Sequence, residues 1–416
     1  MIRILKKISI LIYSILIIFK NIFYLNLFLR DVLILKKNVF PVPSGAIGHF
    51  PLSIYIAKKL YGINTIFFYK KNAKISNKYL EKKLKKTVCF DQKYSQIYEI
   101  MTSLKKLTFG FYNYNELPEH MFMGKNLNFS KSFQDGEKLF EFNSDEDLKG
   151  NNFLKKNNIN KENFVCFIVR TAEYNKIYGS SQQAKKEDDV RKFFNVDQES
   201  YILSLRYLVD SDCSVIRMGK GFSNPFPFKH KNFFDYAISE DRNDFLDVWL
   251  SANCKFFFGT TNGIISLPAL FYKPILGTNQ FPIGSIMSYL PNSVNLPRIA
   301  KKNGNLLNLQ DHVNLGIIRT VNGVYYKQIE VDLLENDPED ILNGVKDIEN
   351  KINNGFHLSN LNILFWKNLE KTWNKNSIQK KGIWEKRYFE DFHKINGISA
   401  SIPDFYLKKY KKVFIE

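Results

Sequence analysis

The chain has 416 residues, with 60 lysines and arginines against 41 aspartates and glutamates, which gives a formal net charge of +19. A chain of this length exceeds one typical hydrophobic core and predicts two domains. The charge indicates an anionic partner, such as a membrane surface or a phosphate-bearing substrate. Zinc-finger spacings, RNP-type aromatic motifs and helix-turn-helix patterns are absent from the sequence, so we expect no nucleic acid among the partners.

Residues 1–37 are predicted to form an apolar segment that associates with a membrane. Arg3, Lys6 and Lys7 precede a run of twelve uncharged residues, and Lys20 interrupts before a second apolar run. A helix that spans a bilayer needs about twenty mostly apolar residues, and the segment reaches that length only with Lys20 included. Three interpretations stay open: a helix lying in an anionic membrane surface, a single spanning anchor, and an ordinary buried helix.

A first β-turn-α unit follows this segment. Residues 39–42 read as a strand, and a turn containing Gly45, Gly48 and His49 leads to a helix over residues 52–60. Residues 63–69 supply a second strand by their β-branched and aromatic content. We expect a Rossmann-like domain over residues 38–150, with the junction near Gly150, because residues 135–163 are polar and rich in Asn and Lys.

Strands and helices alternate again over residues 151–355. Apolar runs predict strands at residues 164–169, 215–218, 256–259 and 274–276, and residues 201–209 have helical spacing. This alternation indicates a parallel, doubly wound sheet in a second domain. Residues 356–416 contain Trp366, Trp373 and Trp384 and are too apolar for a free tail, so we expect a C-terminal helical extension.

The four cysteines are widely separated and include no CxxC pair. Cys166, Cys213 and Cys254 lie in or beside apolar segments, which is typical of reduced thiols in a core. This favours a cytoplasmic catalytic body and argues against a disulfide framework or a cysteine-based metal site.

The stretch over residues 237–280 is the most informative for function. An amphipathic helix and a Phe-rich strand lead into a turn at residues 259–263, with the sequence Gly-Thr-Thr-Asn-Gly, and Ser266 can cap the helix that comes next. Ligands of open α/β sheets bind beyond the carboxyl ends of the strands, and a polar turn before a helix favours a phosphate group. A polar connection without a ligand is the alternative interpretation.

Six short motifs occur in a fixed order along the chain: GAIGHF (45–50), FVCFIVRTAEY (164–174), VIRMG (215–219), DYAIS (235–239), DFLDVWLSANCKFFFGTTNG (244–263) and LPALFYKP (267–274). In this order they resemble a family of bacterial glycosyltransferases associated with surface-polysaccharide synthesis. The resemblance covers most of the chain from about Pro41 onward. It implies a GT-B-like pair of Rossmann-like domains and sugar transfer from a nucleotide-sugar. The acceptor domain would comprise residues 38–150, and the nucleotide-sugar donor domain would comprise residues 151–355. The reduced cysteines and the apolar N-terminal segment together lead us to expect a cytoplasmic protein, peripheral to or anchored in the inner membrane.

Two arginines are candidates for holding the diphosphate of such a donor. Arg170 comes directly after the strand at residues 164–169, and Arg217 lies near the end of the strand at residues 215–218. Guanidinium groups match phosphate geometry and stabilise the charge that grows on a leaving diphosphate; a structural ion pair is the alternative for each. In transferases with an HxR pattern a histidine stands two residues before the arginine, where this chain has Ile168. The other expected donor-binding residues are Gly219, Thr260, Thr261, Asn262, Gly263 and Ser266.

His49 is the best candidate for the base that takes the proton of the acceptor hydroxyl, and a structural histidine at a helix start is the alternative. Gly45 and Gly48 would let a substrate approach the backbone closely. The acidic triplets at residues 145–147 and 210–212 resemble the DxD pattern of metal-dependent transferases, but both lie in polar connecting stretches. We therefore expect no metal, and no cofactor besides the nucleotide-sugar substrate.

The sequence thus predicts a metal-independent glycosyltransferase that moves a sugar from a nucleotide diphosphate donor to a cell-surface glycan or lipid-linked acceptor. HExxH, GxSxG and Walker-type motifs are absent from the sequence, which argues against the common hydrolase and NTPase classes. Two other interpretations stay open. One is a different polysaccharide-modifying transferase, such as a pyruvyl transferase, and the other is a non-catalytic, membrane-bound scaffold of polysaccharide assembly.

Overall fold

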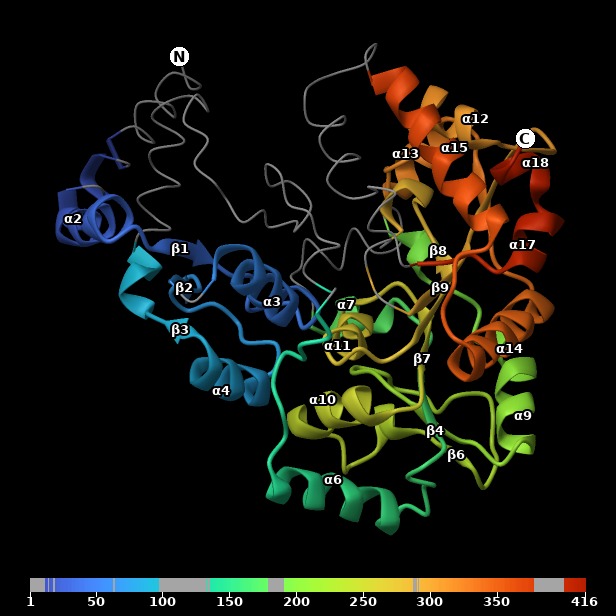
Figure 1. The fold of residues 1–416 in the computed structure, drawn as a ribbon, viewed down its shortest axis with the longest axis horizontal. Coiled ribbons are helices and arrows are strands. Elements are labelled where there is room, and N and C mark those ends of the chain that lie inside the picture. The colour runs from blue at the N-terminus through green and yellow to red at the C-terminus, as the bar shows by residue number, and fades with distance from the viewer. Residues whose placement is uncertain are drawn as a thin grey trace. The chain divides into compact units, whose positions relative to one another are not determined.

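The computed structural model describes residues 12–13, 15–17, 19–62, 64–96, 133, 135–178, 191–286, 290, 292–377 and 400–416. The chain divides into two compact units, Met1–Leu127 and Asn128–Glu416. Each unit combines helices with a parallel sheet (Figure 1). The α/β fold class predicted from the sequence is therefore confirmed.

The first unit is built on a three-stranded parallel sheet in the order β1-β2-β3. The predicted β-turn-α unit is present, because the first strand leads through a loop at residues 42–48 into a long helix that is largely buried. Within the described part of this unit, the strands lie side by side in chain order. Its helices and strands are α2 (Ile22–Leu29), β1 (Asn38–Pro41), α3 (His49–Tyr61), β2 (Thr65–Phe68), α4 (Lys78–Thr87) and β3 (Cys89–Phe90).

The N-terminal helix α2 completes the core of the first unit with one of its faces. A π-helical turn, Arg30–Ile34, continues it and contains the fully buried Asp31. Asp31 accepts hydrogen bonds from the Tyr94 hydroxyl and from the Arg30 guanidinium. Burial raises the pKa of Asp31, but these hydrogen bonds and the charge of Lys37 outweigh it and hold the pKa at about 2. The packed face comprises Ile17, Tyr24, Leu25 and Phe28, which lie against Ile66, Phe68 and Tyr94.

The interpretation of the N-terminal segment as an ordinary buried helix holds only for this packed face. Among the described residues, no helix has both the length and the apolar character that crossing a bilayer requires. Residues 1–11, which include Arg3, Lys6 and Lys7, lie outside the described residues.

The second unit is built on a six-stranded sheet in which all neighbouring strands run parallel. The spatial order is β6-β5-β4-β7-β8-β9. Counted along the chain, this is the order 3-2-1-4-5-6 of the doubly wound Rossmann fold, as the alternation of strands and helices predicts. The strands are β4 (Phe164–Ile168), β5 (Ser214–Arg217), β6 (Phe233–Phe234), β7 (Phe257–Thr260), β8 (Ile275–Gln280) and β9 (Ser293–Pro297).

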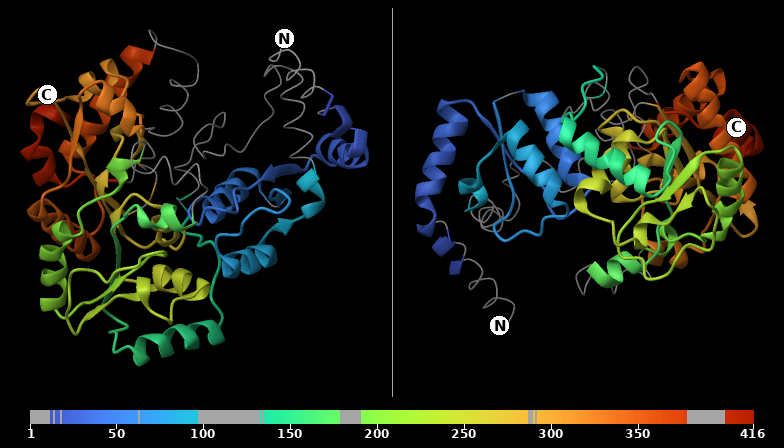
Figure 2. Two further views of the ribbon diagram at one scale, coloured as in Figure 1. Left: turned by 180° about the vertical axis from the view of Figure 1, so that it is seen from behind. Right: turned by 90° about the horizontal axis from the view of Figure 1, so that it is seen from below.

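Helices cover both faces of this sheet, as Figure 1 and the view from behind in Figure 2 show. On one face α9 (Ile202–Asp210) packs with α14 (Pro338–Asn354). On the other face lie α10 (Asp244–Asn253) and α11 (Ser266–Ala269), and α6 (Ser144–Lys156) packs against α10. The second unit is thus a three-layer α/β/α structure.

The predicted junction residue, Gly150, lies inside α6. A Cβ built on Gly150 would come within 2.1 Å of the Trp249 indole, and Trp249 Nε1 donates to Asp147. The polar stretch that suggested a linker is instead an amphipathic helix whose N-terminus is closed by a capping box between Asn143 and Glu146. The division between the compact units falls earlier, after Leu127.

The C-terminal helices extend the second unit. Trp366 is buried and donates from Nε1 to the Ala400 carbonyl oxygen, and Ser401 forms an isolated parallel bridge with Val294 of β9. The side chain of Trp373 and all of Trp384 lie outside the described residues. The remaining elements of the unit are α7 (Glu173–Tyr178), the antiparallel sheet of β10 (Ile299–Lys302), β11 (Asn305–Leu306) and β12 (Asp332–Leu334), and the helices α12 (Leu309–Asn314), α13 (Gly323–Gln328), α15 (Asn360–Ser377), α17 (Asp404–Lys409) and α18 (Lys411–Phe414).

The cysteines are free thiols, and three of them lie in the core as predicted. Cys166, Cys213 and Cys254 are buried, whereas Cys89 is exposed. Burial raises the pKa of Cys213 to about 12, so this thiol is neutral and behaves as a small apolar side chain.

Gly259 lets β7 lie against β4 at the centre of the main sheet. It pairs with Ile168 in the β4–β7 register and has a φ of +141°. A Cβ built on Gly259 would lie 1.9 Å from the Ile168 carbonyl oxygen. Both the backbone conformation and the close approach therefore require glycine.

Gly259→Ala should lower the free energy of unfolding by at least about 2 kcal/mol, because the new methyl group meets backbone atoms that cannot move aside. Gly304→Ala is a matched control, since Gly304 also has a positive φ, +82°, but no atom within 4 Å of its Cβ position. In the control variant the free energy of unfolding should fall by only about 1 kcal/mol, the cost of placing alanine in the left-handed conformation. Urea denaturation measures both losses, and equal losses would show that the β4–β7 approach is not tight.

Candidate functional site

The strand order of the six-stranded sheet reverses between β4 and β7. β5 and β6 lie on one side of this point, and β8 and β9 lie on the other. In doubly wound sheets, ligands bind outside the carboxyl ends of the strands at the point of reversal. The residues directly after β4 and β7 are therefore the first candidates for a binding site.

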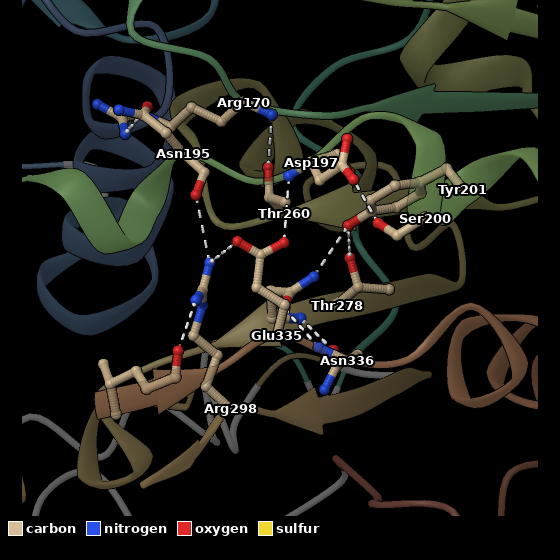
Figure 3. Close-up of polar contacts among 12 residues, drawn as sticks. Arg170, Asn195, Asp197, Ser200, Tyr201, Thr260, Thr278, Arg298, Glu335 and Asn336 are labelled. Carbon is tan, nitrogen blue, oxygen red and sulfur yellow. Dashed lines mark hydrogen bonds and ion pairs between the residues drawn. The ribbon is translucent and has the colours of Figure 1, made fainter. Parts of the chain in front are cut away.

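Arg170 and Thr260 meet at this switch point (Figure 3). The Arg170 backbone N–H donates to Thr260 Oγ1 at 2.8 Å. This bond uses the acceptor side of the hydroxyl, whose own hydrogen can be donated to a second acceptor. The sequence places both residues at strand ends, and the structure brings the two strand ends together.

The Arg170 side chain is oriented by residues of the segment before α9. Its Nη1 donates to Asn195 Oδ1 at 3.0 Å, and the guanidinium lies over the Phe194 ring, 5.1 Å from the ring centroid. Arg170 is only partly buried. A guanidinium that is held in place and still reached by solvent is suited to binding a phosphate or carboxylate group.

The turn after β7 is held by its own side chains. Thr261 Oγ1 donates to Gln280 Oε1 at 3.0 Å, and Asn262 Nδ2 donates to the Thr260 carbonyl oxygen at 2.5 Å. Asn262 Oδ1 accepts from the Ile264 N–H at 3.0 Å, so Asn262 caps the 3-10 turn that leads into α11. These hydrogen bonds preorganise the turn. The Thr261 hydroxyl hydrogen is donated to Gln280, and Gly263 is the exposed residue of the turn.

Ser266 does not have the capping role that the sequence predicts. It is the first residue of α11, which begins directly after the 3-10 turn Gly263–Ile265, and it is 7% exposed. The helical structure therefore begins closer to the strand than expected, because the Asn262 side chain satisfies its first free N–H group.

Arg298 is a residue of this edge that the sequence analysis does not single out. It comes directly after β9, and its side chain is 2% exposed. Its Nη1 donates to the Leu333 carbonyl oxygen at 3.1 Å, and its Nη2 lies 3.4 Å from Glu335 Oε1. A single basic residue within the apolar run at residues 293–300 is the signal that could have found it.

Asn195 connects the two arginines. Its Oδ1 accepts from Arg170, and its backbone carbonyl oxygen accepts from Arg298 Nη2 at 3.3 Å (Figure 3). Glu335, which pairs with Arg298, also accepts from the Asp197 N–H at 3.1 Å through its other oxygen. The segment that positions Arg170 is thus fastened to the strands beyond β8 by two charged residues.

Arg217 is placed in a buried ion pair. Its side chain is 1% exposed, and its Nη1 donates to both carboxylate oxygens of Asp235, at 3.2 and 3.0 Å. Burial lowers the pKa of the Arg217 guanidinium, and the charge of Asp235 opposes this shift. The guanidinium also lies 4.0 Å from the centroid of the Phe222 ring, and a Cβ on Gly219 would come within 2.5 Å of that ring. Arg217 and Gly219 therefore belong to one packed, structural arrangement, and we leave both out of the proposed donor contacts.

His49 lies in the first unit as the first residue of α3, directly after Gly48. The loop before it is tied to the loop after β2, since Ser44 Oγ donates to the Lys74 carbonyl oxygen at 3.1 Å and the Ser44 carbonyl oxygen accepts from the Ser76 N–H. Gly45 is exposed, and a Cβ there would make only an ordinary contact of 3.5 Å. The loop and His49 thus lie at the carboxyl end of β1, the edge at which α/β sheets bind ligands.

The acidic triplets have structural surroundings. Glu146 takes part in the α6 capping box and Asp147 accepts from Trp249, while Asp212 lies in the turn after α9 with a φ of +57°. Within the described ranges, no group of three or more His, Cys, Asp or Glu residues is arranged to hold a metal ion.

The chain was compared with family models, curated proteins and solved structures. No family model matches the chain, and no curated protein matches it. The chain is similar to the crystal structure of a glycosyl transferase family 9 protein from Veillonella parvula DSM 2008, with 8% sequence identity and a TM-score of 0.43. That similarity covers 75% of this chain and 96% of the other.

Arg217→Leu should lower the free energy of unfolding by about 3 kcal/mol, because it leaves the carboxylate of Asp235 without its ion-pair partner. Lys156→Ala removes an exposed ion pair with Asp241 and should change stability little. Chemical denaturation checks both variants. An Arg217→Leu variant that is as stable as the parent but has lost nucleotide affinity would show that Arg217 binds the ligand and is not structural.

Proposed function

We propose that the protein is a metal-independent glycosyltransferase that moves a sugar from a nucleotide diphosphate donor to a cell-surface glycan or lipid-linked acceptor. The fold of the second unit supports nucleotide binding, since it has the strand order of dinucleotide-binding Rossmann domains. The sugar-transfer chemistry is what the sequence motifs imply by their resemblance to bacterial glycosyltransferases.

The observation that carries the proposal is the junction of Arg170 and Thr260 at the switch point. We assign the donor diphosphate to this place, with the Arg170 guanidinium on a phosphate group and the exposed backbone of Gly263 beside it. In such a transfer the diphosphate leaves with a growing negative charge, and a fixed guanidinium stabilises that charge in the transition state. Thr260, Thr261 and Asn262 hold the turn in shape through their hydrogen bonds to one another and to their neighbours.

We assign acceptor activation to His49. An imidazole is suited to accept the proton of a sugar hydroxyl as that hydroxyl attacks the donor. The position of His49 after the first strand, at the start of α3, supports this assignment. Gly45 and Gly48 belong to the same loop and are the proposed acceptor-loop residues.

We further propose that the protein works in the cytoplasm, peripheral to or anchored in the inner membrane, where lipid-linked acceptors are held. Its proposed partners are the nucleotide-sugar, the glycan or lipid-linked acceptor and an anionic membrane surface. The net charge of +19 supports the two anionic partners, the nucleotide-sugar and the membrane surface.

Arg170→Ala should weaken the binding of a nucleoside diphosphate in EDTA by about 1.5 to 3 kcal/mol, the cost of losing a charge-assisted hydrogen bond. Isothermal titration calorimetry with UDP, GDP and ADP measures this and identifies the nucleotide. Arg206→Ala is the matched control, because it removes the same charge from the exposed side of α9 and should leave affinity unchanged.

Two outcomes would count against the donor site. If no nucleoside diphosphate binds the parent protein, the nucleotide-binding assignment fails and the scaffold interpretation is favoured. If binding requires added divalent metal, or if Arg206→Ala weakens it as much as Arg170→Ala, a specific, metal-free contact at Arg170 is excluded.

His49→Ala should reduce turnover by about a hundredfold or more while nucleotide affinity stays the same, because a general base acts on the acceptor and not on the donor. His357→Ala, which changes an exposed histidine of the second unit, is the control for loss of any histidine. Donor-consumption assays measure turnover, and a His49→Ala variant with nearly full activity would remove His49 from the mechanism.

A further inference from the structure

The N-terminal segment, which comprises α2, the described residues before it and the π-helical turn after it, has a second apolar side that the described residues leave exposed. Of the 23 large hydrophobic side chains that are exposed in the described residues, eleven lie between residues 12 and 35. Each of the eleven is at least 40% exposed. We call this set the outer face: Ile12, Tyr13, Ile15, Leu16, Phe19, Ile22, Phe23, Leu29, Leu33, Ile34 and Leu35.

The outer face is distinct from the face that packs on the sheet of the first unit. Tyr24, Leu25 and Phe28 lie against the β2 side of the core, whereas Phe19 and Phe23 are 67% and 66% exposed. Soluble proteins rarely expose so many neighbouring apolar side chains, and those that do use them to bind a partner or a membrane.

The exposed charges that residues 19–37 place around the outer face are all positive. Lys20 and Lys36 are exposed, and the side chains of Arg30 and Lys37 are 49% and 35% exposed. Asp31 is the one acidic residue between residues 19 and 37, and it is fully buried against Tyr94 on the inner side. An apolar face with Phe and Tyr side chains and a cationic border matches the boundary between the acyl chains and headgroups of an anionic lipid surface.

We infer that residues 12–37 lie in the plane of an anionic lipid surface, with the outer face inserted at the headgroup boundary and the opposite face still part of the protein core. Because one side of the helix packs on β2, lipid cannot surround it, and the segment binds the surface without spanning. The inference rests on the membrane association that is part of the proposed function. Of the three interpretations left open by the sequence, it selects the helix that lies in an anionic membrane surface.

The same geometry makes the membrane-binding element part of the fold. Deleting residues 1–37 would remove Tyr24, Leu25, Phe28 and Asp31 from the core of the first unit, so truncation would unfold the unit as well as release it. Substitutions at Phe19 and Phe23 separate the two effects, because most of each side chain, 67% and 66%, is exposed.

The test compares the full-length protein with the double variant Phe19→Ser/Phe23→Ser in a vesicle cosedimentation assay. With vesicles of phosphatidylcholine mixed with phosphatidylglycerol, the double variant should bind at least about tenfold more weakly, since two large apolar side chains no longer leave water. Its circular dichroism and unfolding midpoint should match the parent. Leu148→Ser, which changes a side chain of α6 that is 59% exposed, is the matched control and should bind like the parent.

The charge requirement is tested with the same protein. Binding of the parent should weaken on vesicles of phosphatidylcholine alone and on mixed vesicles at raised salt, because the cationic border then loses its attraction to the surface. Equal binding to neutral and anionic vesicles would overturn the anionic part of the inference.

The inference as a whole would be overturned if the parent failed to bind mixed vesicles or if the double variant bound them as the parent does. It would also be overturned if Leu148→Ser weakened binding as much as the double variant does. A parent that is dimeric without vesicles, becomes monomeric on Phe19→Ser/Phe23→Ser and does not bind vesicles would show that a second copy covers the outer face. The assay contains no nucleotide, so its outcome is independent of whether the donor site assignment holds.

Discussion

The close approach of β4 and β7 is the constraint on which the rest of the second unit depends. Glycine at position 259 lets the two strands pair without a side chain between Gly259 and the Ile168 carbonyl oxygen. Just beyond this pair, the strand ends are joined by the hydrogen bond from the Arg170 N–H to Thr260 Oγ1. The turn after β7 and the point at which Arg170 leaves β4 therefore lie side by side at the carboxyl edge of the sheet.

Around this pair, polar side chains are used for positioning. The hydroxyl and amide groups of the turn hold one another and the end of β8, and Asn195 joins Arg170 to the buried Arg298. Groups held in this way cost little to reorganise when a charged ligand binds, which is the usual basis of electrostatic stabilisation in enzymes. Few hydroxyl groups of the turn can then donate a hydrogen bond to a ligand, so the proposed site depends on the Arg170 guanidinium.

In the first unit, the N-terminal helix is only partly covered by the protein. This helix is apolar on all sides, and a helix of this kind is stable in water only if its whole surface is covered. The sheet covers one face, and Asp31 fixes the end of the helix through Tyr94 and Arg30. The outer face remains exposed among the described residues, so a membrane surface would complete the burial of this helix.

The sequence by itself determined the local structure and the places of the strand ends. Apolar and aromatic runs predicted β4, β5 and β7 within one residue of their observed bounds, because strand formation here depends on side chains that are buried on both faces. Tertiary structure alone decided that the two arginines have different surroundings, since Arg217 is buried and Arg170 is only partly buried. Arg170 and Arg217 both stand at strand ends, but Asp235 pairs with Arg217 and Asn195 orients Arg170, and neither partner is adjacent in the chain. Tertiary structure also decided the packing of the N-terminal helix, because its apolar residues occur on all sides and do not follow the helical period that would mark one buried face. Which face packs is decided by β2 and Tyr94, since contacts between distant segments depend on how the chain folds back and not on local spacing.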